Sequence, residues 1–234
     1  MASNIVPTYA CTINISGTST ATTGEATQAF SGSGANTVVQ IATAARRCMD
    51  PSVAIVVKDG VGTVAAASYI IEPLYGKIRF QSYTPSGAIT VDYNYFPLLP
   101  IAGAHTFNVK AEREKINVTQ FSQGVTLAGE DFILGKKMSS GDFSTWENYV
   151  KDHGSGVTMK SVLEGSTPVM LDARLIASAI SGTGTTPGFR CFAVVHGWKA
   201  GLSESGAVDH QGSWQGVKYG LLDNSNFAWG EDYA

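Results

Sequence analysis

The segment Ile89-Thr90-Val91-Asp92-Tyr93-Asn94-Tyr95 decides the fold class. Its apolar and aromatic residues recur at every second position, which is the period of a β-strand with one buried face. The buried face would carry Ile89, Val91, Tyr93 and Tyr95. β-Branched and aromatic residues fit such a pleated surface well. The segment therefore predicts a strand of an antiparallel sheet.

Similar short segments precede this strand. Residues 9–15, 53–57, 69–71 and 77–80 are apolar or alternating, and turn residues separate them, such as Asp59-Gly60. Residues 17–34 are small and polar and predict an exposed loop, while residues 42–49 predict one or two helical turns. Pro97 and Pro100 mark a boundary, because proline cannot donate to a strand ladder. Short strands between such turns predict a sandwich or barrel.

The second half continues the β pattern. Phe107, Val109 and Ala111 alternate with polar residues, and after Arg113 and Glu114 the segment 115–121 predicts the second strand of a hairpin. A loop follows at 122–131. Residues 143–150 favour a strand over a helix, and residues 157–163 predict one short helix. Residues 168–176, 189–199 and 214–222 predict further strands.

Together these patterns predict a mainly β protein. The fold class is an antiparallel β-sandwich or barrel domain with one short helix at residues 101–234, preceded by a small β-rich module at residues 1–100. Hydrophobic residues make up 44% of the 234 residues, which is enough for a core. The 26 glycines and the 10% of aromatic residues suit turns and pleated sheets.

Charge and composition exclude several classes of protein. A formal net charge of -3 gives no basic footprint for reading nucleic acid. No apolar run approaches the roughly 18 residues of a membrane span, and we expect no export signal at the N-terminus. The three cysteines are too scattered for a disulfide framework or a zinc site, so they predict reduced thiols, two of them in the core.

No catalytic constellation emerges from the sequence. The four histidines lack metal-ligand spacing, and the serines lack a nucleophile elbow. We therefore predict no catalytic, cofactor-binding or metal-ligating residues and no cofactor. An enzyme would require His196 or His210 to meet a carboxylate or a serine in a cleft. With these classes of protein set aside, the sequence leaves two possibilities, an assembly subunit or a ligand-binding module.

An ordered set of short motifs covers most of the chain. In the first half it comprises Gly24-Glu25-Ala26-Thr27, residues 40–47, Asp50-Pro51, and residues 56–60, 69–71, 76–80 and 91–95. In the second half it comprises residues 102–107, 116–121 and 162–171. This order resembles the tail tube (major tail) proteins of long-tailed bacteriophages. One departure from the resemblance is the polar link to the predicted helix at residues 146–156, which is longer than we would expect in such proteins.

The resemblance implies a structural subunit of a virion tail. Such subunits form rings, commonly hexameric, that stack into a tube through which DNA passes during ejection. The implied partners are copies of the same chain, other tail proteins at the tube ends and transiently passing DNA, with no membrane. The implied location is the virion tail, after synthesis and assembly in the cytoplasm of the bacterial host.

The resemblance also suggests where the working surfaces lie. The polar face of the predicted hairpin is the candidate lumen wall, with a solvated outer face as the alternative; it comprises Thr106, Asn108, Lys110, Glu112, Lys115, Asn117 and Thr119. The candidate ring-stacking loop carries Gly124, Gly129, Glu130 and Asp131. The module at 1–100 would lie outside the tube, although residues 9–15 could join the inner sheet.

A second function stays open at this point. Another virion or surface β module, such as a tail-tip, adaptor or carbohydrate-binding protein, would share the same composition. Exposed aromatic residues on one concave face would favour sugar binding; the candidates are Trp198, Trp214 and Trp229.

Overall fold

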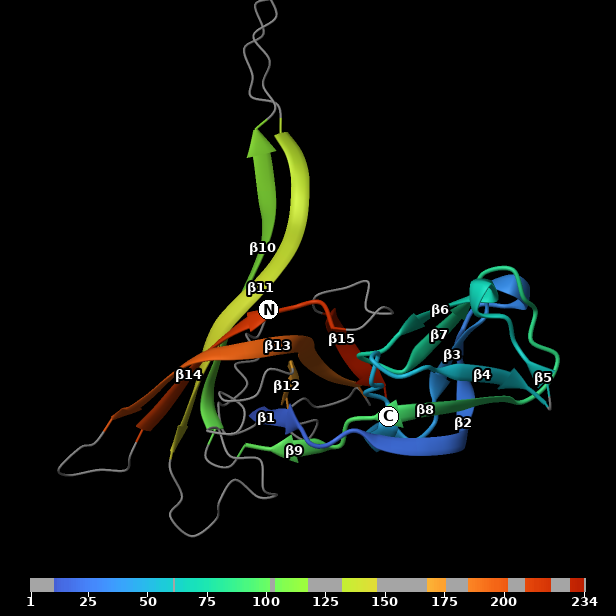
Figure 1. Ribbon diagram of the computed structural model, residues 1–234, viewed down its shortest axis with the longest axis horizontal. Helices are drawn as coiled ribbons and strands as arrows, with labels where there is room; N and C mark the ends of the chain where they lie inside the picture. The colour runs from blue at the N-terminus through green and yellow to red at the C-terminus, as the bar shows by residue number, and fades with distance from the viewer. Residues whose placement is uncertain are drawn as a thin grey trace, which may run out of the picture.

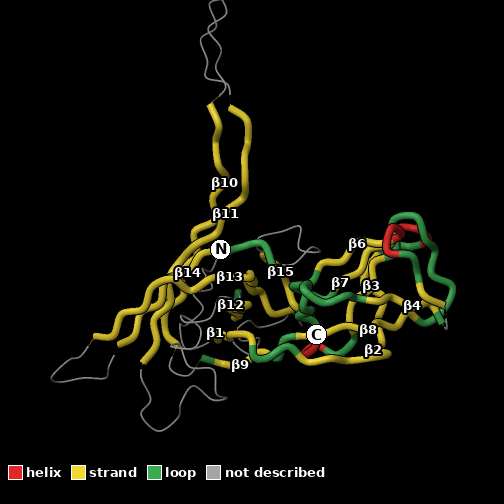
Figure 2. Tube along the Cα trace, viewed as in Figure 1, coloured by secondary structure: helices red, strands yellow, loops and turns green. Residues whose placement is uncertain are grey.

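The described part of the chain is mainly β-strand (Figures 1 and 2). The computed structural model describes residues 11–60, 62–101, 104–117, 132–146, 168–175, 185–201, 209–219 and 228–233. Within these ranges the helical segments are single 3-10 turns: η2 (Gly34–Asn36), η3 (Ala44–Arg46) and η4 (Ala66–Ser68). The mainly β fold class is thereby confirmed.

One antiparallel sheet, which we call the curled sheet, contains strands from both ends of the chain. Its order is β10-β11-β14-β13-β12-β1-β9, and β15 also pairs with β13. The strands are β1 (Cys11–Ser16), β9 (Leu98–Pro100), β10 (Ala104–Asn117), β11 (Phe132–Trp146), β12 (Val169–Leu175), β13 (Thr185–Gly201), β14 (Asp209–Gly216) and β15 (Ala228–Tyr233). Residues 11–15 of the predicted segment 9–15 pair with β12 and β9 and so join the curled sheet, while the identity of this sheet as the inner sheet of a tube stays a prediction.

The curled sheet encloses a single apolar core. Ile15 of β1, Leu171 of β12 and Phe143 of β11 belong to one cluster, and Phe107 of β10 and Leu99 of β9 pack against it. Strands from opposite ends of the strand order therefore meet, which requires the sheet to bend around its own apolar face.

Aromatic rings over glycines shape this core. Trp214 is fully buried and stacks on Phe107 with ring centroids 5.6 Å apart. A Cβ atom on Gly141 would lie 2.8 Å from the Trp214 ring, and one on Gly212 would lie 2.6 Å from the Phe143 ring. The rings occupy space that any larger residue would need, which gives some of the many glycines a packing role.

The other sheet, which we call the small sandwich, folds over its own core. Its order is β5-β4-β8-β2-β3-β7-β6. The strands are β2 (Thr20–Ser31), β3 (Val38–Ile41), β4 (Val56–Asp59), β5 (Gly62–Thr63), β6 (Tyr69–Glu72), β7 (Lys77–Phe80) and β8 (Ile89–Tyr95). β2 pairs with β8 through its first half and with β3 through its second. Gly24, with φ of +64°, lies at the register shift in the first pairing.

The segment that predicted the fold class behaves as expected. β8 buries Ile89, Val91 and Tyr93 in the sandwich core, and Tyr95 packs against that core half-buried. The intervening residues point outward, as the period of two requires.

Two local predictions are wrong. Residues 20–31 form β2 instead of an exposed loop, because pairing with β8 and β3 overrides the weak strand propensity of its Ala, Gly and Glu residues. The chain also does not turn at Arg113 and Glu114. β10 runs on through them to Asn117, and its hairpin partner is β11, with a register shift between Arg113 and Lys115.

Other predictions fall partly outside the described residues. β11 continues to Trp146, so residues 143–146 form a strand, while residues 147–150 and the predicted helix at 157–163 lie outside the described ranges. The division into modules at residue 100 stays a prediction. In the strand pairing, β1 and β9 both join the curled sheet, and the small sandwich is inserted between them.

A carboxylate fixes one loop of the small sandwich. The Oδ2 atom of Asp59 accepts hydrogen bonds from the Ser86 backbone N–H at 2.7 Å and from the Tyr83 hydroxyl at 2.8 Å. The Ser86 backbone bond, followed by the Tyr83 bond, lowers the pKa of Asp59 below its usual 3.8. Both donors favour the ionised carboxylate.

This contact makes the sandwich sensitive to acid. A lowered folded-state pKa means that the stabilisation is present above the unfolded-state pKa and is lost as the pH falls through the folded value. We therefore expect Asp59→Asn to lower the melting temperature at neutral pH and to lessen its further drop below about pH 4. Thermal unfolding across a pH series measures both effects. Equal acid-induced drops in wild type and variant would contradict this role.

The glycine beneath Phe143 gives a prediction for the curled sheet. Gly212→Ala forces a methyl group against the ring and should destabilise the protein by about 1–3 kcal/mol. Gly62→Ala is the matched control, because its Cβ would meet only the Asp59 carbonyl oxygen at 3.7 Å, an ordinary contact. Denaturant unfolding compares the two, and a similarly small effect of both would disprove the packing argument.

Candidate functional site

Among the described strands, the outer side of β10 is the longest strand edge without a ladder partner. β10 is the terminal strand of the curled sheet and, within the described residues, forms a ladder only with β11. A strand of 14 residues thus leaves a long row of backbone N–H and C=O groups along its other side. Such an edge is a template for pairing with another strand.

Beyond the body of the sheet, β10 and β11 continue as a two-stranded ribbon. β14 pairs with β11 only from Ser140 to Trp146. Residues 111–117 and 132–139 therefore have just each other as ladder partners among the described strands, and we call this ribbon the arm. Figure 1 shows the arm projecting well away from the rest of the curled sheet. An isolated two-stranded ribbon is at best marginally stable in water.

From Thr106 to Lys110, β10 separates its apolar and polar residues as the sequence predicted, whereas Ala111, predicted on the apolar face, is exposed. Phe107 and Val109 pack against the core of the curled sheet, whereas Asn108, Lys110 and Glu112 are exposed. Thr106, at the start of this polar row, is half-buried. This part of the candidate lumen face is therefore a real surface, although what it faces in use stays a prediction.

The polar row pairs its own charges. Lys110 Nζ lies 2.7 Å from Glu112 Oε1, and the Asn108 amide donates to the Asp142 carboxylate on β11 at 2.7 Å. Asn108 and Asp142 are directly opposite in the ladder, so they share one face of the sheet. Because Asn108 is neutral, Asp142 keeps its negative charge, and the Lys110 cation is matched by Glu112.

The remaining candidates are only partly placed. Lys115 and Asn117 belong to β10 by their backbone, and their side chains lie outside the description. The strand continues through Arg113 with a register shift before Lys115, and neither side chain is described. Their place on the polar face therefore stays a prediction. Thr119 and the candidate stacking residues lie outside the described ranges: Gly124, Gly129, Glu130 and Asp131. Sequence reasoning missed Met138, which is exposed on β11 opposite Glu112.

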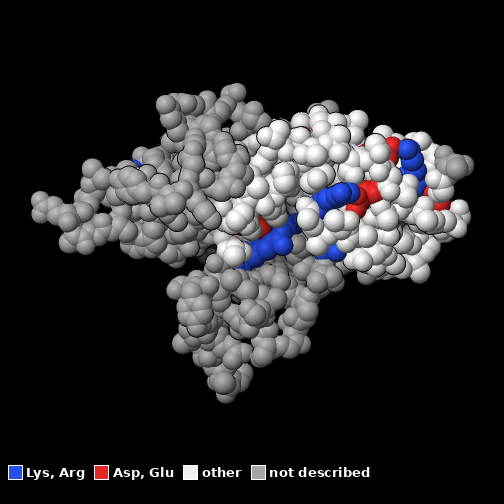
Figure 3. Space-filling model, turned by 90° about the horizontal axis from the view of Figure 1, so that it is seen from below, with Lys and Arg blue, Asp and Glu red and all other residues white. Residues whose placement is uncertain are grey.

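Charges elsewhere on the described surface also occur next to opposite charges. Arg46 Nη1 lies 2.5 Å from Glu25 Oε2, and Lys58 Nζ lies 2.5 Å from Asp92 Oδ2. Figure 3 shows basic and acidic atoms in adjacent groups on one face of the small sandwich, surrounded by uncharged surface. On this face the described residues thus show mixed signs without a broad basic patch.

The small sandwich covers a different outer surface of the curled sheet. Met170 of β12 and Phe192 of β13 point away from the core of the curled sheet and pack instead with Leu74 and Tyr75. The polar row lies on β10, at one end of the strand order, and the covered surface lies on β13 and β12, in the middle of that order. One part of the outer surface of the curled sheet is thus polar and exposed, and another part is apolar and covered by the small sandwich.

Other chemical possibilities find little support among the described residues. Trp214 is buried, so it cannot offer a ring to a sugar, and the side chains of Trp198 and Trp229 lie outside the description. Cys48 and Cys191 are buried and in no disulfide, which confirms the predicted pair of core cysteines. His196 is exposed on β13, and the side chain of His210 is not described.

Among the described residues, no group of three or more histidine, cysteine, aspartate or glutamate side chains is arranged to hold a metal ion. In the same part of the chain, no helix has the length and apolar character needed to cross a membrane.

The chain has matches among solved structures but none among protein families or curated proteins. A solved structure described as the tail of an empty GTA particle with C6 symmetry matches over 57% of this chain and 87% of its own. The sequence identity is 12% and the TM-score is 0.38. Because that score is too low to establish a shared fold, the function proposed below rests on the residues of this chain.

Proposed function

We propose that this protein is a structural subunit of a phage-like tail, which assembles with copies of itself into stacked rings that form a tube. The rings are hexameric, as is common among the proteins that the sequence resembles. The tube is the conduit for DNA, and other tail proteins cap its ends. The proposed location is the virion tail.

The unpaired edge of β10, with the arm that extends it, carries this proposal. A row of 14 residues with one ladder partner favours association with another strand. A ring of identical copies can satisfy every such edge at once, and closed symmetry stops growth within the ring plane. Stacking of rings is a contact that does not close, so it yields a tube.

The polar row on β10 supports a lumen role. A conduit for DNA must be wetted but must not clamp phosphates, since each phosphate contact adds salt-dependent affinity. Lys110 is paired with Glu112, and the nearby Asp142 is an anion that accepts from the neutral Asn108 amide, so these residues are polar without presenting an unmatched cation to a phosphate. The row also lies away from the surface that the small sandwich covers, which supports placing the sandwich outside the tube.

Removing the arm tests the proposal. Ala111 and Ser139 are directly paired, so residues 112–138 can be replaced by an Asn-Gly turn that joins them. Both cores remain intact in this variant, and we expect a folded protein that no longer forms rings or tubes. Negative-stain microscopy and sedimentation over a concentration series measure assembly, and circular dichroism checks folding.

Ile70→Lys provides the control for this deletion. Ile70 is an exposed apolar residue on β6, in the small sandwich and outside the curled sheet. This variant should assemble like the wild type. Normal tubes from the arm deletion, or wild-type protein that stays monomeric even with tail initiator proteins present, would refute the proposed assembly.

A charge change tests the lumen assignment. In Glu112→Lys the exposed ion pair with Lys110 is replaced by two cations, so folding should be unaffected. Assembled tubes should then retain DNA in a salt-dependent manner, which a DNA-release assay at several salt concentrations detects. Glu72→Lys, on β6 of the small sandwich, is the control with the same change of charge and should leave release unchanged. Unaltered release from Glu112→Lys tubes would show that this row faces elsewhere.

A further inference from the structure

The small sandwich and the curled sheet have separate cores. Val91 lies in a cluster made only of sandwich residues, and Cys191 lies in a cluster of the curled sheet. A third cluster joins them through Cys48, Leu74, Tyr75 and Phe96 from residues 48–96 and Met170 and Phe192 from the curled sheet. Each unit thus keeps its own core without this junction, which we call the interface cluster.

The chain crosses between the two units at one place. β1 and β9 are neighbouring strands, with Ile15 opposite Leu99, and the sandwich is inserted between them. The Gly17 N–H donates to the Pro97 carbonyl at 2.8 Å, so the outgoing and returning chains lie side by side. Two adjacent connections of this kind let an inserted unit rotate as one body.

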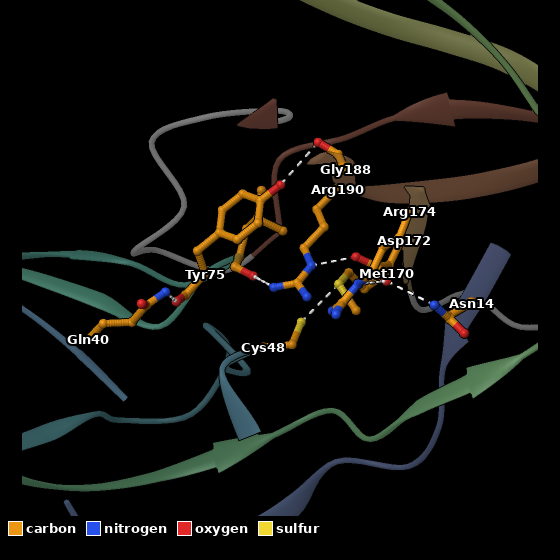
Figure 4. A network of polar contacts seen from close by, with 10 residues as sticks. Asn14, Gln40, Cys48, Tyr75, Met170, Asp172, Arg174, Gly188 and Arg190 are labelled. Atoms are coloured by element: carbon orange, nitrogen blue, oxygen red, sulfur yellow. Dashed lines mark hydrogen bonds and ion pairs between the residues drawn. The ribbon is translucent and has the colours of Figure 1, made fainter. Parts of the chain in front are cut away.

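A buried charge forms the centre of the junction (Figure 4). Arg190 of β13 is 1% exposed, and its Nε donates to Asp172 Oδ1 at 2.5 Å. Its Nη1 donates across the junction to the Leu74 carbonyl at 2.7 Å, and the guanidinium lies 4.6 Å from the centre of the Tyr75 ring. One cation from the curled sheet thus contacts two neighbouring residues of the sandwich.

Asp172 determines where this cation points. The carboxylate is fully buried and also accepts from Arg174 Nε at 2.5 Å and from the Asn14 amide at 2.9 Å. All these partners belong to the curled sheet, so the carboxylate is held in place before the sandwich docks. A buried ion pair of this kind adds little net stability, but losing one partner leaves a costly buried charge.

We propose that the interface cluster acts as a latch. The small sandwich docks onto and releases from the curled sheet as a folded unit, turning on the paired connections at Gly17 and Pro97, and Asp172 keeps the latch closed by orienting Arg190 toward the Leu74 carbonyl. Release exposes Met170, Phe192 and Cys48, all of which are buried when the latch is closed. The latch rests on these contacts alone and does not depend on the proposed assembly.

The two buried thiols report directly on the latch. Cys48 is in the interface cluster, 2.8 Å from Met170 Sδ, whereas Cys191 is in the core of the curled sheet. In a Cys11→Ser background, we expect iodoacetamide to modify Cys48 at least about tenfold faster than Cys191, with a weaker dependence on denaturant. Amide exchange in β8 should stay slow during this labelling, since the sandwich remains folded. Equal rates and equal denaturant dependence, or loss of β8 protection alongside Cys48 labelling, would overturn the latch.

A matched pair of substitutions tests the role of Asp172. Asp172→Asn should accelerate Cys48 modification at least about tenfold and leave Cys191 unchanged. Asp92→Asn is the control, because Asp92 also accepts from a cation at 2.5 Å but lies within the sandwich. Unchanged Cys48 labelling in Asp172→Asn, or equal acceleration in the control, would remove Asp172 from the latch. If Asp172→Asn does not fold, the comparison of thiols in the unsubstituted interface decides the proposal alone.

Discussion

Backbone hydrogen bonding along β10 is the constraint on which the structure depends. The strand is long, and one side of it pairs with β11 from Ala104 to Asn117, with two register shifts. Its other side has no ladder partner in the described part of the chain. Natural proteins usually shorten, bend or cover such an edge. Here the edge is extended by the arm, which lacks support from β14. A chain that lengthens its open margin in this way is suited to joining other chains.

The packing of the curled sheet makes that edge available. Its core gathers residues from β10 to β9, and the stack of Trp214 on Phe107 attaches the edge strand to that core. Close approach of rings to Gly141 and Gly212 lets the sheet bend tightly. The bend places the polar row of β10 on one outer surface and leaves another surface for the small sandwich. The same bent sheet therefore provides the apolar core, the open edge of β10 and the surface on which the small sandwich packs.

Alternation of residue types was sufficient to predict the elements that bury one face. β8 follows its pattern closely, and so does the first part of β10, because burial on one side leaves a period of two in the sequence. β2 does not follow from the sequence pattern, since its Ala and Gly residues have weak strand propensity and its pairing depends on partners distant in the sequence. The hairpin was misplaced because Arg113 and Glu114 look like turn residues but lie within a strand. The Asp172–Arg190 contact joins neighbouring strands and its link to Leu74 crosses 116 positions, a separation that no local pattern reveals.

Amide exchange along β10 tests the central claim most directly, measured for the same protein as a monomer and after assembly. The account predicts that half of the β10 amides, those pointing away from β11, exchange rapidly in the monomer and at least about a hundredfold more slowly in the assembled state. Amides of β8, inside the small sandwich, should not change. Slow exchange at every β10 amide in the monomer, or no slowing upon assembly, would contradict the claim that copies of this chain complete one another's sheets.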